Sequence, residues 1–444
     1  MSRTDRYKKR PVKPGGKSIG SKKGISRKKS RKRPEFLLLM TLLLLGIIFL
    51  IITFTGGGKT TDQAGNPLSG SKEVKLVSTA TIGSMGDLLI HSPFLETYDL
   101  GGDNWDFNGI FKYIKPYIEK LDYAAINFEG TISNQERGYS AYPLFRLPAA
   151  VADSVKAAGF DLALTGNNHI MDGGSEGFAI TQTVLKEKKL DVLGSRSAES
   201  QPKYLIKEIN GIKVGMVNWT YGKLFDDGST NLNGILVNST NSRLIEIYDY
   251  ERLDSFYVEQ QKIIEEMRKK GAEAIVYFMH WGMEYKTEQN SLQREIAQNL
   301  CNLGVDAIVG GHPHVIQPIE TFKAAASDHT MISIYSLGNA VSNQRVERMD
   351  LKTGHTEDGV LYTLTFSKYS DGKVVLSDAG ILPTWVNVVV SDGNKYYEIV
   401  PIDTAVNWSG FLYSPDQVSK ATASYNRTME LLAGGLEAWK ALPK

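Results

Sequence analysis

Cysteine is almost absent from this chain of 444 residues, which contains only Cys301. An intrachain disulfide is therefore excluded, and any folded part must be stabilised by its hydrophobic core. Cys301 lies in SLQREIAQNLCNLG, a segment with helical periodicity, and we interpret it as a small apolar core residue. A P-loop of the form G-x-x-x-x-G-K-[ST] is also missing, so nothing in the sequence indicates a site for ATP. A ligase that consumes ATP is accordingly disfavoured.

Charge is missing from one long segment. Residues 36–54, FLLLMTLLLLGIIFLIITF, form a run of 19 uncharged and mostly apolar residues. As a helix rising about 1.5 Å per residue, this run spans roughly 28 Å, close to the hydrocarbon thickness of a bilayer. A cleaved signal peptide is the alternative, but the run is long for one, and GGGKTTDQAGNP after it offers no A-x-A cleavage site. We predict a retained transmembrane helix.

Acidic residues are scarce before this helix. Residues 1–33 contain 15 Lys or Arg and one acid, Asp5, so the positive-inside rule predicts a cytoplasmic tail over 1–35 and an extracytoplasmic remainder. We expect the tail to contact anionic lipid head groups or an acidic partner, whereas nucleic acid is disfavoured beside a membrane span. Without residues 1–33, the chain has 36 basic and 48 acidic residues, a net charge of −12. An anionic substrate would therefore require a local cation such as a metal ion.

Strand-like and helix-like segments alternate after a polar, Gly/Ser/Thr-rich stretch at 55–75, which indicates a flexible linker. The alternation predicts an α/β fold with buried, largely parallel strands, and Asn210-Gly211 predicts a hairpin turn. After Thr330 mostly strands follow, indicating a second sheet or an antiparallel extension of the first, and then a terminal helix in YNRTMELLAGGLEAWKAL. The other predicted segments are the strands VKLVSTATIGSMG, DYAAINFE, FDLALTGN, AEAIVYFMHWG and VDAIVGGH, and the helices AAVADSVKAAG, SEGFAITQTVLKEKK, VEQQKIIEEMRKKG and LQREIAQNLCNLG.

Side chains able to bind a metal ion follow five of the predicted strands. Because the carboxyl ends of parallel strands face a common crevice, we expect these side chains to lie together. An extended His312-Pro313-His314 would place both imidazoles on one face, and Gly310 and Gly311 would let the backbone approach closely. A mixture of His, carboxylate and Asn donors suits zinc, manganese or iron better than calcium. The residues are Asp87 and His91, Asn127 and Glu129, Asn168 and His169, His280, and finally His312 and His314.

Each of these residues also has an ordinary structural interpretation. A single His after a strand is more often a hydrogen-bonded loop residue, Asp87 alone would suit a turn or a helix N-cap, and Glu129 alone would suit an ion pair. Five such coincidences at equivalent positions would be needed together, so we favour a metal site.

Six motifs in order, GDLLIH, NFEG, GNNHIMDGG, HWGMEY, GGHPHVIQP and SLGN, resemble those of the bacterial capsule-synthesis protein CapA family. That family is tied to poly-γ-glutamate capsule production and is similar to calcineurin-like metallophosphatases. The resemblance covers roughly residues 76–402 and leaves 403–444 as a C-terminal extension. It implies a four-layer αββα sandwich with the site at the sheet edge, binding one or two divalent ions.

The metallophosphatase pattern transfers residue by residue. The resemblance implies that His169 is the catalytic acid that protonates the leaving group, and that the other matched residues bind metal. Two departures stand out: His91 lies four residues after Asp87 where the phosphatases have Asp-x-His, and the bridging acid is Glu129 where they have Asp. His91 would then bind metal after a helical turn, or bind substrate, as would Asn127. The implied metal ligands are Asp87, Glu129, Asn168, His280, His312 and His314.

Four further residues are interpreted as supporting the site. Asp172 and Glu284 follow His motifs and would orient imidazoles by accepting their second N–H. Arg146 would clamp an anionic group, although a solvated loop Arg is the alternative, and Asn339 would shape the rim of the site.

Two functions are compatible with this pattern. The first is a membrane-anchored hydrolase-like protein that acts on an anionic polymer or a phosphoester during capsule-polymer synthesis, export or processing. The second is a non-catalytic, membrane-tethered scaffold for other membrane capsule-synthesis proteins, with a structural metal site.

Overall fold

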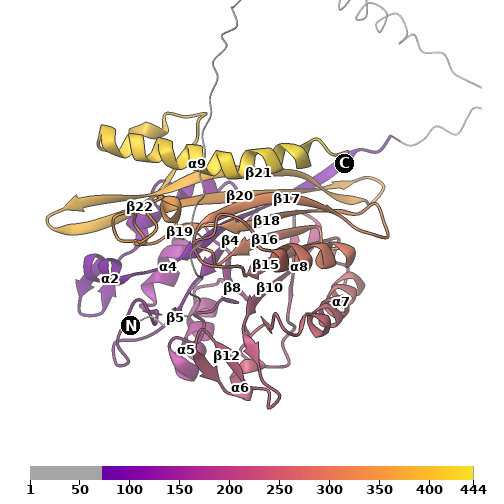
Figure 1. The fold of residues 1–444 in the computed structure, drawn as a ribbon, viewed down its shortest axis with the longest axis horizontal. Helices are drawn as coiled ribbons and strands as arrows, with labels where there is room; N and C mark the ends of the chain where they lie inside the picture. The colour runs from indigo at the N-terminus through magenta and orange to yellow at the C-terminus, as the bar shows by residue number, and fades with distance from the viewer. Residues whose placement is uncertain (1–72, 444) are drawn as a thin grey trace, which may run out of the picture. The chain divides into compact units, whose positions relative to one another are not determined.

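The computed structural model describes residues 73–443 (Figure 1). The predicted tail, the predicted transmembrane helix at 36–54 and almost all of the predicted linker lie outside the described residues. Within 73–443, no helix is both long enough and apolar enough to span a bilayer. The compact unit described below is Val74–Lys444.

A mixed sheet of eight strands forms one half of this unit, which confirms a mixed α/β fold. The strands from the first part of the described chain, between residues 76 and 193, pair in parallel. The strands after residue 357 extend the same sheet in antiparallel orientation. In spatial order the strands are β22 (Asn394–Pro401), β21 (Val374–Ser391), β20 (Asp358–Tyr369), β1 (Leu76–Leu88), β4 (Tyr123–Phe128), β7 (Leu162–Leu164) and β8 (Asp191–Leu193), with β19 (Asn339–Val341) paired to β1.

A second sheet, of seven strands, forms the other half. The hairpin predicted at Asn210-Gly211 is confirmed: it joins two antiparallel strands of this sheet, and both turn residues have positive φ, 50° and 78°. The strands are β14 (Ile247–Tyr248), β10 (Ile212–Tyr221), β15 (Ala274–His280), β16 (Ala307–Gly311), β18 (Thr330–Leu337) and β17 (Ile316–Lys323), with β9 (Leu205–Ile209) paired to β10.

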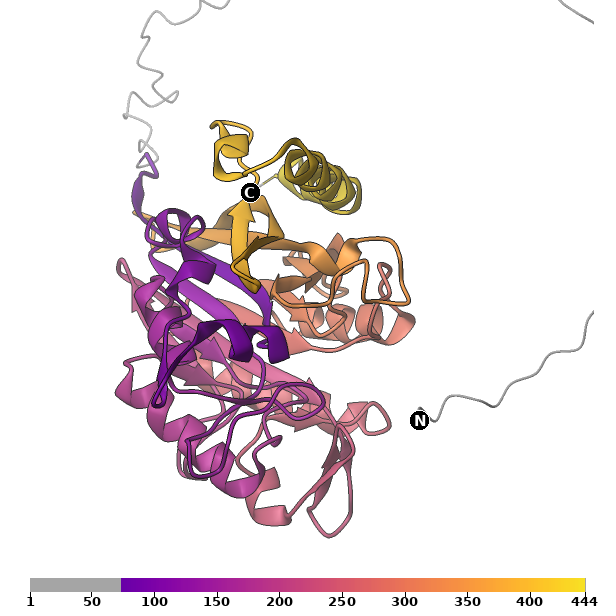
Figure 2. The ribbon, with the colours of Figure 1, turned by 90° about the vertical axis from the view of Figure 1, so that its left-hand side faces the viewer.

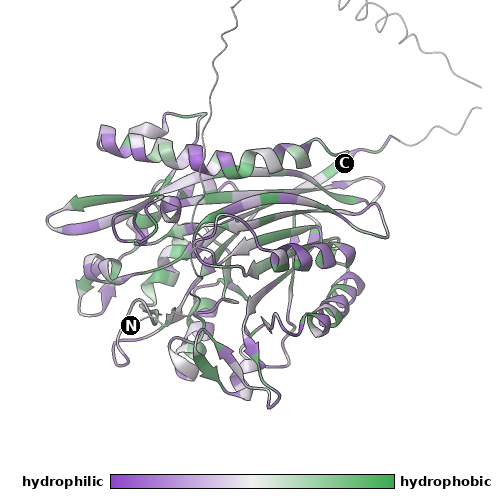
Figure 3. Cartoon of the chain, in the orientation of Figure 1, coloured by the Kyte–Doolittle hydropathy of each residue, from purple (hydrophilic) through white to green (hydrophobic). Residues whose placement is uncertain are grey.

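Alternating side chains explain how the two sheets pack. On β4, Tyr123 and Ala125 join a core cluster with Met216 of β10 and Val276 of β15, so this cluster lies between the sheets. The intervening residues of β4, such as Ile126, face a different cluster shared with the helices. In Figure 3 the central strands are mostly green, whereas the helices mix purple and green, as amphipathic helices do.

Helices cover the outer faces of the sheets. Clusters of buried residues join the eight-stranded sheet to α2 (Ser92–Tyr98), α4 (Ala150–Ala157) and α5 (Gly174–Glu187). A further cluster joins the seven-stranded sheet to α7 (Leu253–Lys269) and α8 (Ser291–Asn302). The shorter elements are α3 (Lys115–Ile118), α6 (Ser239–Ser242), the small sheets β2 (Asp99–Gly101) with β3 (Asn104–Trp105), β5 (Thr131–Ile132) with β6 (Arg146–Leu147), and β11 (Lys223–Leu224) with β12 (Thr230–Leu232) and β13 (Ile235–Val237), and 3-10 turns at Asn108–Phe111, His355–Glu357 and Trp408–Phe411.

The terminal helix α9 (Pro415–Lys440) begins ten residues before the predicted segment at Tyr425. Ser414 caps it by accepting a hydrogen bond from the backbone N–H of Gln417, and Pro415 occupies the first turn, where no N–H is needed. Its Leu432 joins the core cluster between the sheets. Figures 1 and 2 place α9 at the opposite end of the unit from the small sheet β11–β13.

Candidate functional site

The side chains predicted to bind a metal ion, which come from five strands, do converge, but the strands belong to two sheets. Asp87 is the penultimate residue of β1, Glu129 directly follows β4, and Asn168 with His169 follows β7, all in the eight-stranded sheet. His280 ends β15, and the His312-Pro313-His314 segment follows β16, both in the seven-stranded sheet. The carboxyl ends of parallel strands from both sheets therefore meet at one place.

Two carboxylates form the centre of the site. Ligand atoms of Asp87, Glu129 and His280 lie within 4.8 Å of one another, and all three residues are buried. Asn127 lies between the acids: its Nδ2 donates to Asp87 Oδ1 at 2.7 Å and to Glu129 Oε2 at 2.9 Å. Its own Oδ1 accepts from Asn167 Nδ2 at 3.0 Å. Both ends of the Asn127 amide are therefore hydrogen-bonded, and the side chain holds the two acids apart. The sequence had suggested a metal or substrate ligand at this position.

Imidazoles surround these acids. His314 Nδ1 lies 3.0 Å from Asp87 Oδ2, and its Nε2 lies 4.0 Å from Glu129 Oε1. His280 Nε2 is 3.9 Å from the same Glu129 oxygen and 2.8 Å from Asn168 Oδ1. The His280 and His312 rings are 4.8 Å apart between centroids. All six predicted ligands therefore belong to one buried cluster.

The backbone of the closing His pair differs from the prediction. His312 and His314 have φ values of 96° and 57°, so the extended tripeptide expected from the sequence is wrong. Left-handed backbone at such residues costs about 1–3 kcal/mol and is concentrated at functional sites. The close approach expected of the preceding glycines is confirmed: a Cβ on Gly310 would lie 2.0 Å from the Tyr335 carbonyl oxygen, and one on Gly311 3.0 Å from Asp87 Oδ1. The tight turn brings the His312 N–H within 3.3 Å of Asp87 Oδ2.

His169 has a carboxylate behind its ring. Its Nδ1 is 2.7 Å from Asp172 Oδ2, which also accepts the backbone N–H of Phe145 at 2.6 Å. The Phe145 ring packs edge-on against the His169 ring at 4.9 Å. With Nδ1 held by Asp172, Nε2 is the nitrogen left to exchange a proton.

His91 lies next to the cluster, with its Nδ1 facing backbone groups. It is the N-cap residue of α2, and its Nδ1 is 3.2 Å from the backbone N–H of Asn343 and 3.3 Å from the Leu89 carbonyl. Its ring meets Phe145 edge-on at 5.4 Å. Burial lowers the pKa of His91 to about 4, so the ring is neutral at physiological pH. The helical turn considered from the sequence does form, beginning directly after His91. The Nδ1 contacts hold the His91 ring against the backbone of Leu89 and Asn343.

The remaining predicted residues lie at the margin. Arg146 donates from Nε to Ser140 Oγ at 2.9 Å and from Nη1 to the Arg137 carbonyl at 3.4 Å, so its contacts hold its own loop. Glu284 is exposed; burial, and then the charge of Glu284, raise the pKa of the neighbouring Tyr285 phenol.

Asn339 is fully buried beside Asp87, with which it pairs in the β1–β19 register. Its Nδ2 is 3.3 Å from the His314 carbonyl oxygen and 2.9 Å from that of Thr356. It therefore fixes the backbone of His314 from beneath the site, whereas the sequence placed it at the rim.

Three contributors escaped the sequence analysis. The Tyr221 hydroxyl lies 3.2 Å from His312 Nε2, Asn167 supports Asn127, and Phe145 supports Asp172. Asn167 is the first Asn of the GNNH motif, which was the available signal. Tyr221 ends β10, whose sequence has the pattern of an ordinary core strand, and so nothing marked it as a site residue. Phe145 acts partly through its backbone N–H, which no side-chain motif reveals.

The donor set fits a bound cation. Glu129 Oε1 and His312 Nδ1 are buried and have no hydrogen-bond partner among the described residues. Burial, and then the Asp87 charge, raise the pKa of Glu129 well above its usual range. Burial lowers the pKa of His280 and of His312 well below the usual value, which leaves neutral imidazoles able to ligate. Two adjacent buried carboxylates and neutral imidazoles together can hold a divalent ion.

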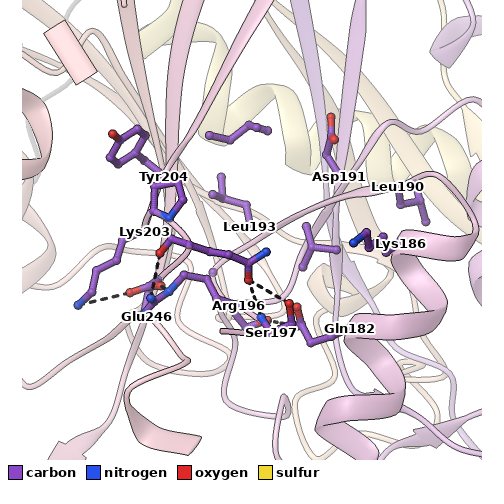
Figure 4. A pocket seen from close by; sticks show the side chains of 16 residues that line it. Gln182, Lys186, Leu190, Asp191, Leu193, Arg196, Ser197, Lys203, Tyr204 and Glu246 are labelled. Carbon is purple, nitrogen blue, oxygen red and sulfur yellow. Dashed lines mark hydrogen bonds and ion pairs between the residues drawn. The ribbon is translucent and has the colours of Figure 1, made fainter. Parts of the chain in front are cut away.

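A separate open cavity of about 260 Å³ lies beside β8 and is drawn in Figure 4. Arg196 Nε donates to Glu246 Oε1 at 2.6 Å, and Lys203 Nζ lies 3.7 Å from the other Glu246 oxygen. None of the site residues predicted from the sequence lines this cavity. We interpret its charges as an ion-pair network that holds the segment after β8.

Comparison with known proteins identifies the family of this chain. Residues 81–344, more than half of the chain, match the family described as bacterial capsule synthesis protein PGA_cap. The PGA biosynthesis protein CapA of Bacillus subtilis (strain 168) is 29% identical over 300 residues, covering 66% of this chain and 70% of that protein. The capsule biosynthesis protein CapA of Bacillus anthracis is 26% identical over 323 residues, covering 71% of each.

A more distant relative is an enzyme. The 2',3'-cyclic-nucleotide 2'-phosphodiesterase/3'-nucleotidase of Haemophilus influenzae is 25% identical over 208 residues, which cover 47% of this chain and 26% of that protein. The match over residues 81–344 includes every predicted metal ligand. The chain belongs to the PGA_cap family of bacterial capsule synthesis proteins.

Proposed function

We propose that this protein is a membrane-anchored, extracytoplasmic, metal-dependent hydrolase of the phosphoesterase type, which acts in the synthesis, export or processing of an anionic capsule polymer. In this proposal the helix at 36–54 anchors the chain and the four-layer, metallophosphatase-like unit lies outside the membrane. One or two ions, of manganese, zinc or iron, would be held by Asp87, Glu129, Asn168, His280, His312 and His314.

The observation that carries this proposal is the position of the His169–Asp172 pair. A buried Asp–His pair, 2.7 Å apart, stands directly beside Asn168, which is bonded to His280 of the cation-binding cluster. A structural metal site needs ligands but no such acid–base pair beside them. The arrangement is suited to proton transfer at an atom held next to a cation.

Each group has a defined task in this scheme. A bound divalent ion would supply Lewis-acid polarisation and a water of lowered pKa. Asp172 accepts the Nδ1–H of His169 and directs its Nε2 toward the leaving-group oxygen, to which that nitrogen donates a proton. Asn127 holds the two carboxylates at a fixed separation, and Asn339 holds the backbone of His314.

The comparisons support the two halves of the proposal separately. The names of the Bacillus relatives support a role in capsule biosynthesis. The name of the Haemophilus relative supports phosphoester hydrolysis. The net charge of −12 outside the tail gives a physical reason for a cation at a site that accepts an anionic substrate.

The test is His169→Ala in the purified full-length protein loaded with manganese or zinc. Hydrolysis of a 2',3'-cyclic nucleotide, whose leaving sugar oxygen must be protonated, should fall by about 10²–10⁴-fold, the usual contribution of a general acid, while bound metal stays the same. His329→Ala, in the β17–β18 loop, is the matched control and should keep wild-type activity. A scaffold gives the opposite result: no hydrolysis by the wild type, and normal capsule production in cells that carry His169→Ala.

A further inference from the structure

Asn218 is a buried amide that connects the two sheets next to the candidate metal site. It lies within β10, in the seven-stranded sheet, and is 3% exposed. Its Oδ1 accepts the backbone N–H of Gly166 at 2.7 Å, and its Nδ2 lies 3.4 Å from the carbonyl oxygen of the same residue. Gly166 follows β7 of the eight-stranded sheet and opens the GNNH motif. One side chain of the seven-stranded sheet therefore bonds both backbone polar groups of a residue in the loop that carries this motif.

The same amide also reaches the strand that ends in His280. Its Nδ2 donates to the carbonyl oxygen of Phe278 at 3.3 Å, and Phe278 precedes His280 by two residues. On the other side, Gly166 precedes Asn168 by two residues. Asn168 and His280 are in turn in contact, with 2.8 Å between Oδ1 of the first and Nε2 of the second. Asn218 thus links the two chain segments that carry this pair of predicted ligands.

Two glycines make room for the Asn218 side chain. A Cβ on Gly166 would lie 2.7 Å from Asn218 Oδ1, and one on Gly194, directly after β8, would lie 2.2 Å from the same oxygen. Both distances are shorter than those at which Cβ atoms are found from their neighbours. The loops after β7 and β8 can therefore close on this amide because both residues are glycine.

Asn167 holds the same loop by a different route. Its Nδ2 donates to the Phe128 carbonyl oxygen at 2.9 Å and to Asn127 Oδ1 at 3.0 Å. Both partners lie on β4, so these bonds fix the loop within its own sheet. Asn218 comes from the other sheet, and its bonds therefore fix the distance of the loop from that sheet.

Asn218 also lies close to the acids of the site. Together with Asp87, Asn127 and His280, it lines an internal cavity of about 20 Å³ that strands of both sheets enclose. All three hydrogen bonds of its side chain go to backbone groups. It is therefore a neighbour of the predicted ligands that supports their backbone, and it is not itself a ligand.

We propose that Asn218 is the positioning residue that sets the separation of Asn168 and His280 across the two sheets. The inference rests on the proposed function, in which these two residues hold a metal ion and His169, next to Asn168, supplies a proton. Asn218 acts through the backbone that carries the two ligands and touches neither the ion nor the substrate. Without the amide, the loop after β7 loses its bonds to β10 and β15, and the two ligands are no longer held at one distance.

Metal affinity tests this role without requiring turnover. Asn218→Ala removes all three bonds and should weaken manganese binding by about 10–100-fold, the usual effect of losing a residue that supports a ligand. Asn387→Ala is the matched control, because Asn387 is another fully buried amide, bonded to Glu398 on β22, and it should bind manganese as the wild type does. Affinity is measured by chelator competition on the metal-free full-length protein, at a temperature at which circular dichroism shows the variants folded.

A second variant approaches the same contact from the other side. Gly166→Ala leaves Asn218 intact but places a Cβ 2.7 Å from its Oδ1, so the loop must shift. Its manganese affinity should fall as that of Asn218→Ala does. NMR of metal-free protein labelled at its histidine rings should show the His280 signals shifted in both variants. The signals of His329, in the β17–β18 loop, should stay in place.

The outcomes separate this inference from the proposed function. Unchanged manganese affinity and unchanged His280 signals in folded Asn218→Ala would overturn the positioning role. An equal loss of affinity in Asn387→Ala would overturn it as well, and if Asn218→Ala does not fold, Gly166→Ala decides. If the wild type hydrolyses the cyclic nucleotide through His169 while both variants keep full metal affinity, the function stands and the inference fails. If both variants lose affinity and His169→Ala changes no activity, the inference stands and the catalytic function fails. A wild type that binds neither manganese nor zinc would overturn both.

Discussion

The hydroxyl of Tyr221 lies 3.2 Å from Nε2 of His312, while Nδ1 of the same ring is buried and has no partner among the described residues. Metal-binding imidazoles commonly use one nitrogen for the ion and bond the other to a neighbour, which fixes the ring orientation. Tyr221 is in this position, at the end of β10 and outside every motif that marks the site.

Tyr221→Phe should therefore weaken metal binding by about 10–100-fold, because it removes only the oxygen that holds His312. Affinity is measured by competition with a chromogenic chelator on the metal-free full-length protein. Tyr335→Phe, which breaks a bond to Glu320 elsewhere in the same sheet, is the control. Equal metal affinity in Tyr221→Phe and the wild type would show that His312 needs no such support.

Glu129→Gln should have opposite effects on stability and on metal binding. In the metal-free protein, folded Glu129 keeps a proton that the unfolded chain has lost, between the ordinary pKa of about 4.3 and its raised value. The free energy of unfolding therefore falls as pH rises through that window, and the neutral Gln removes this loss.

We expect metal-free Glu129→Gln to gain about 1–3 kcal/mol over the wild type at neutral pH, since the substitution removes a buried charge whose Oε1 has no hydrogen-bond partner among the described residues. Thermal melts between pH 5 and pH 9, after treatment with a chelator, measure the gain, with the exposed Glu288→Gln as the control. The same variant should lose most of its metal in elemental analysis. A metal-free variant that melts below the wild type would contradict the expectation.

Asp172→Asn should slow hydrolysis without removing metal. The substitution weakens the hold on His169 Nδ1 but leaves the ring and the cluster in place. We expect kcat to fall at least about tenfold, a part of the 10²–10⁴-fold that the acid contributes, while KM and metal content change little. Steady-state kinetics measure kcat and KM, and elemental analysis measures the metal content. An increase in KM with kcat unchanged would assign Asp172 to substrate binding.

Protease added to intact, wall-stripped cells should release a large fragment that begins between about residues 55 and 75, as the charge difference around residues 36–54 predicts. Mass spectrometry of the released fragment locates the cleavage. Protection of the fragment until the cells are lysed would reverse the predicted orientation.

Particular residues show what could be read from the sequence. His280 was expected at a strand end, and β15 does end there. The backbone of His312 and His314 was mispredicted, because the extended geometry typical of a tripeptide after a strand gives way to packing against Asp87 and Tyr335. The position of Asn127 between two acids depends on the β1–β4 register, in which Asp87 and Asn127 are paired. A register between strands 40 residues apart is set by tertiary packing, which a motif does not encode.

The division of the cluster between two sheets also has a consequence for assembly. Asp87 lies in β1, and Glu129 and Asn168 follow β4 and β7, all strands of the first sheet. His280, His312 and His314 come from the second sheet, whose strands follow these three in the chain. A nascent or truncated chain that ends before residue 312 would hold the acids without their closing His pair. Capture of the ion would then report that the two sheets have come together: a polypeptide that retains metal has already joined both halves of its core.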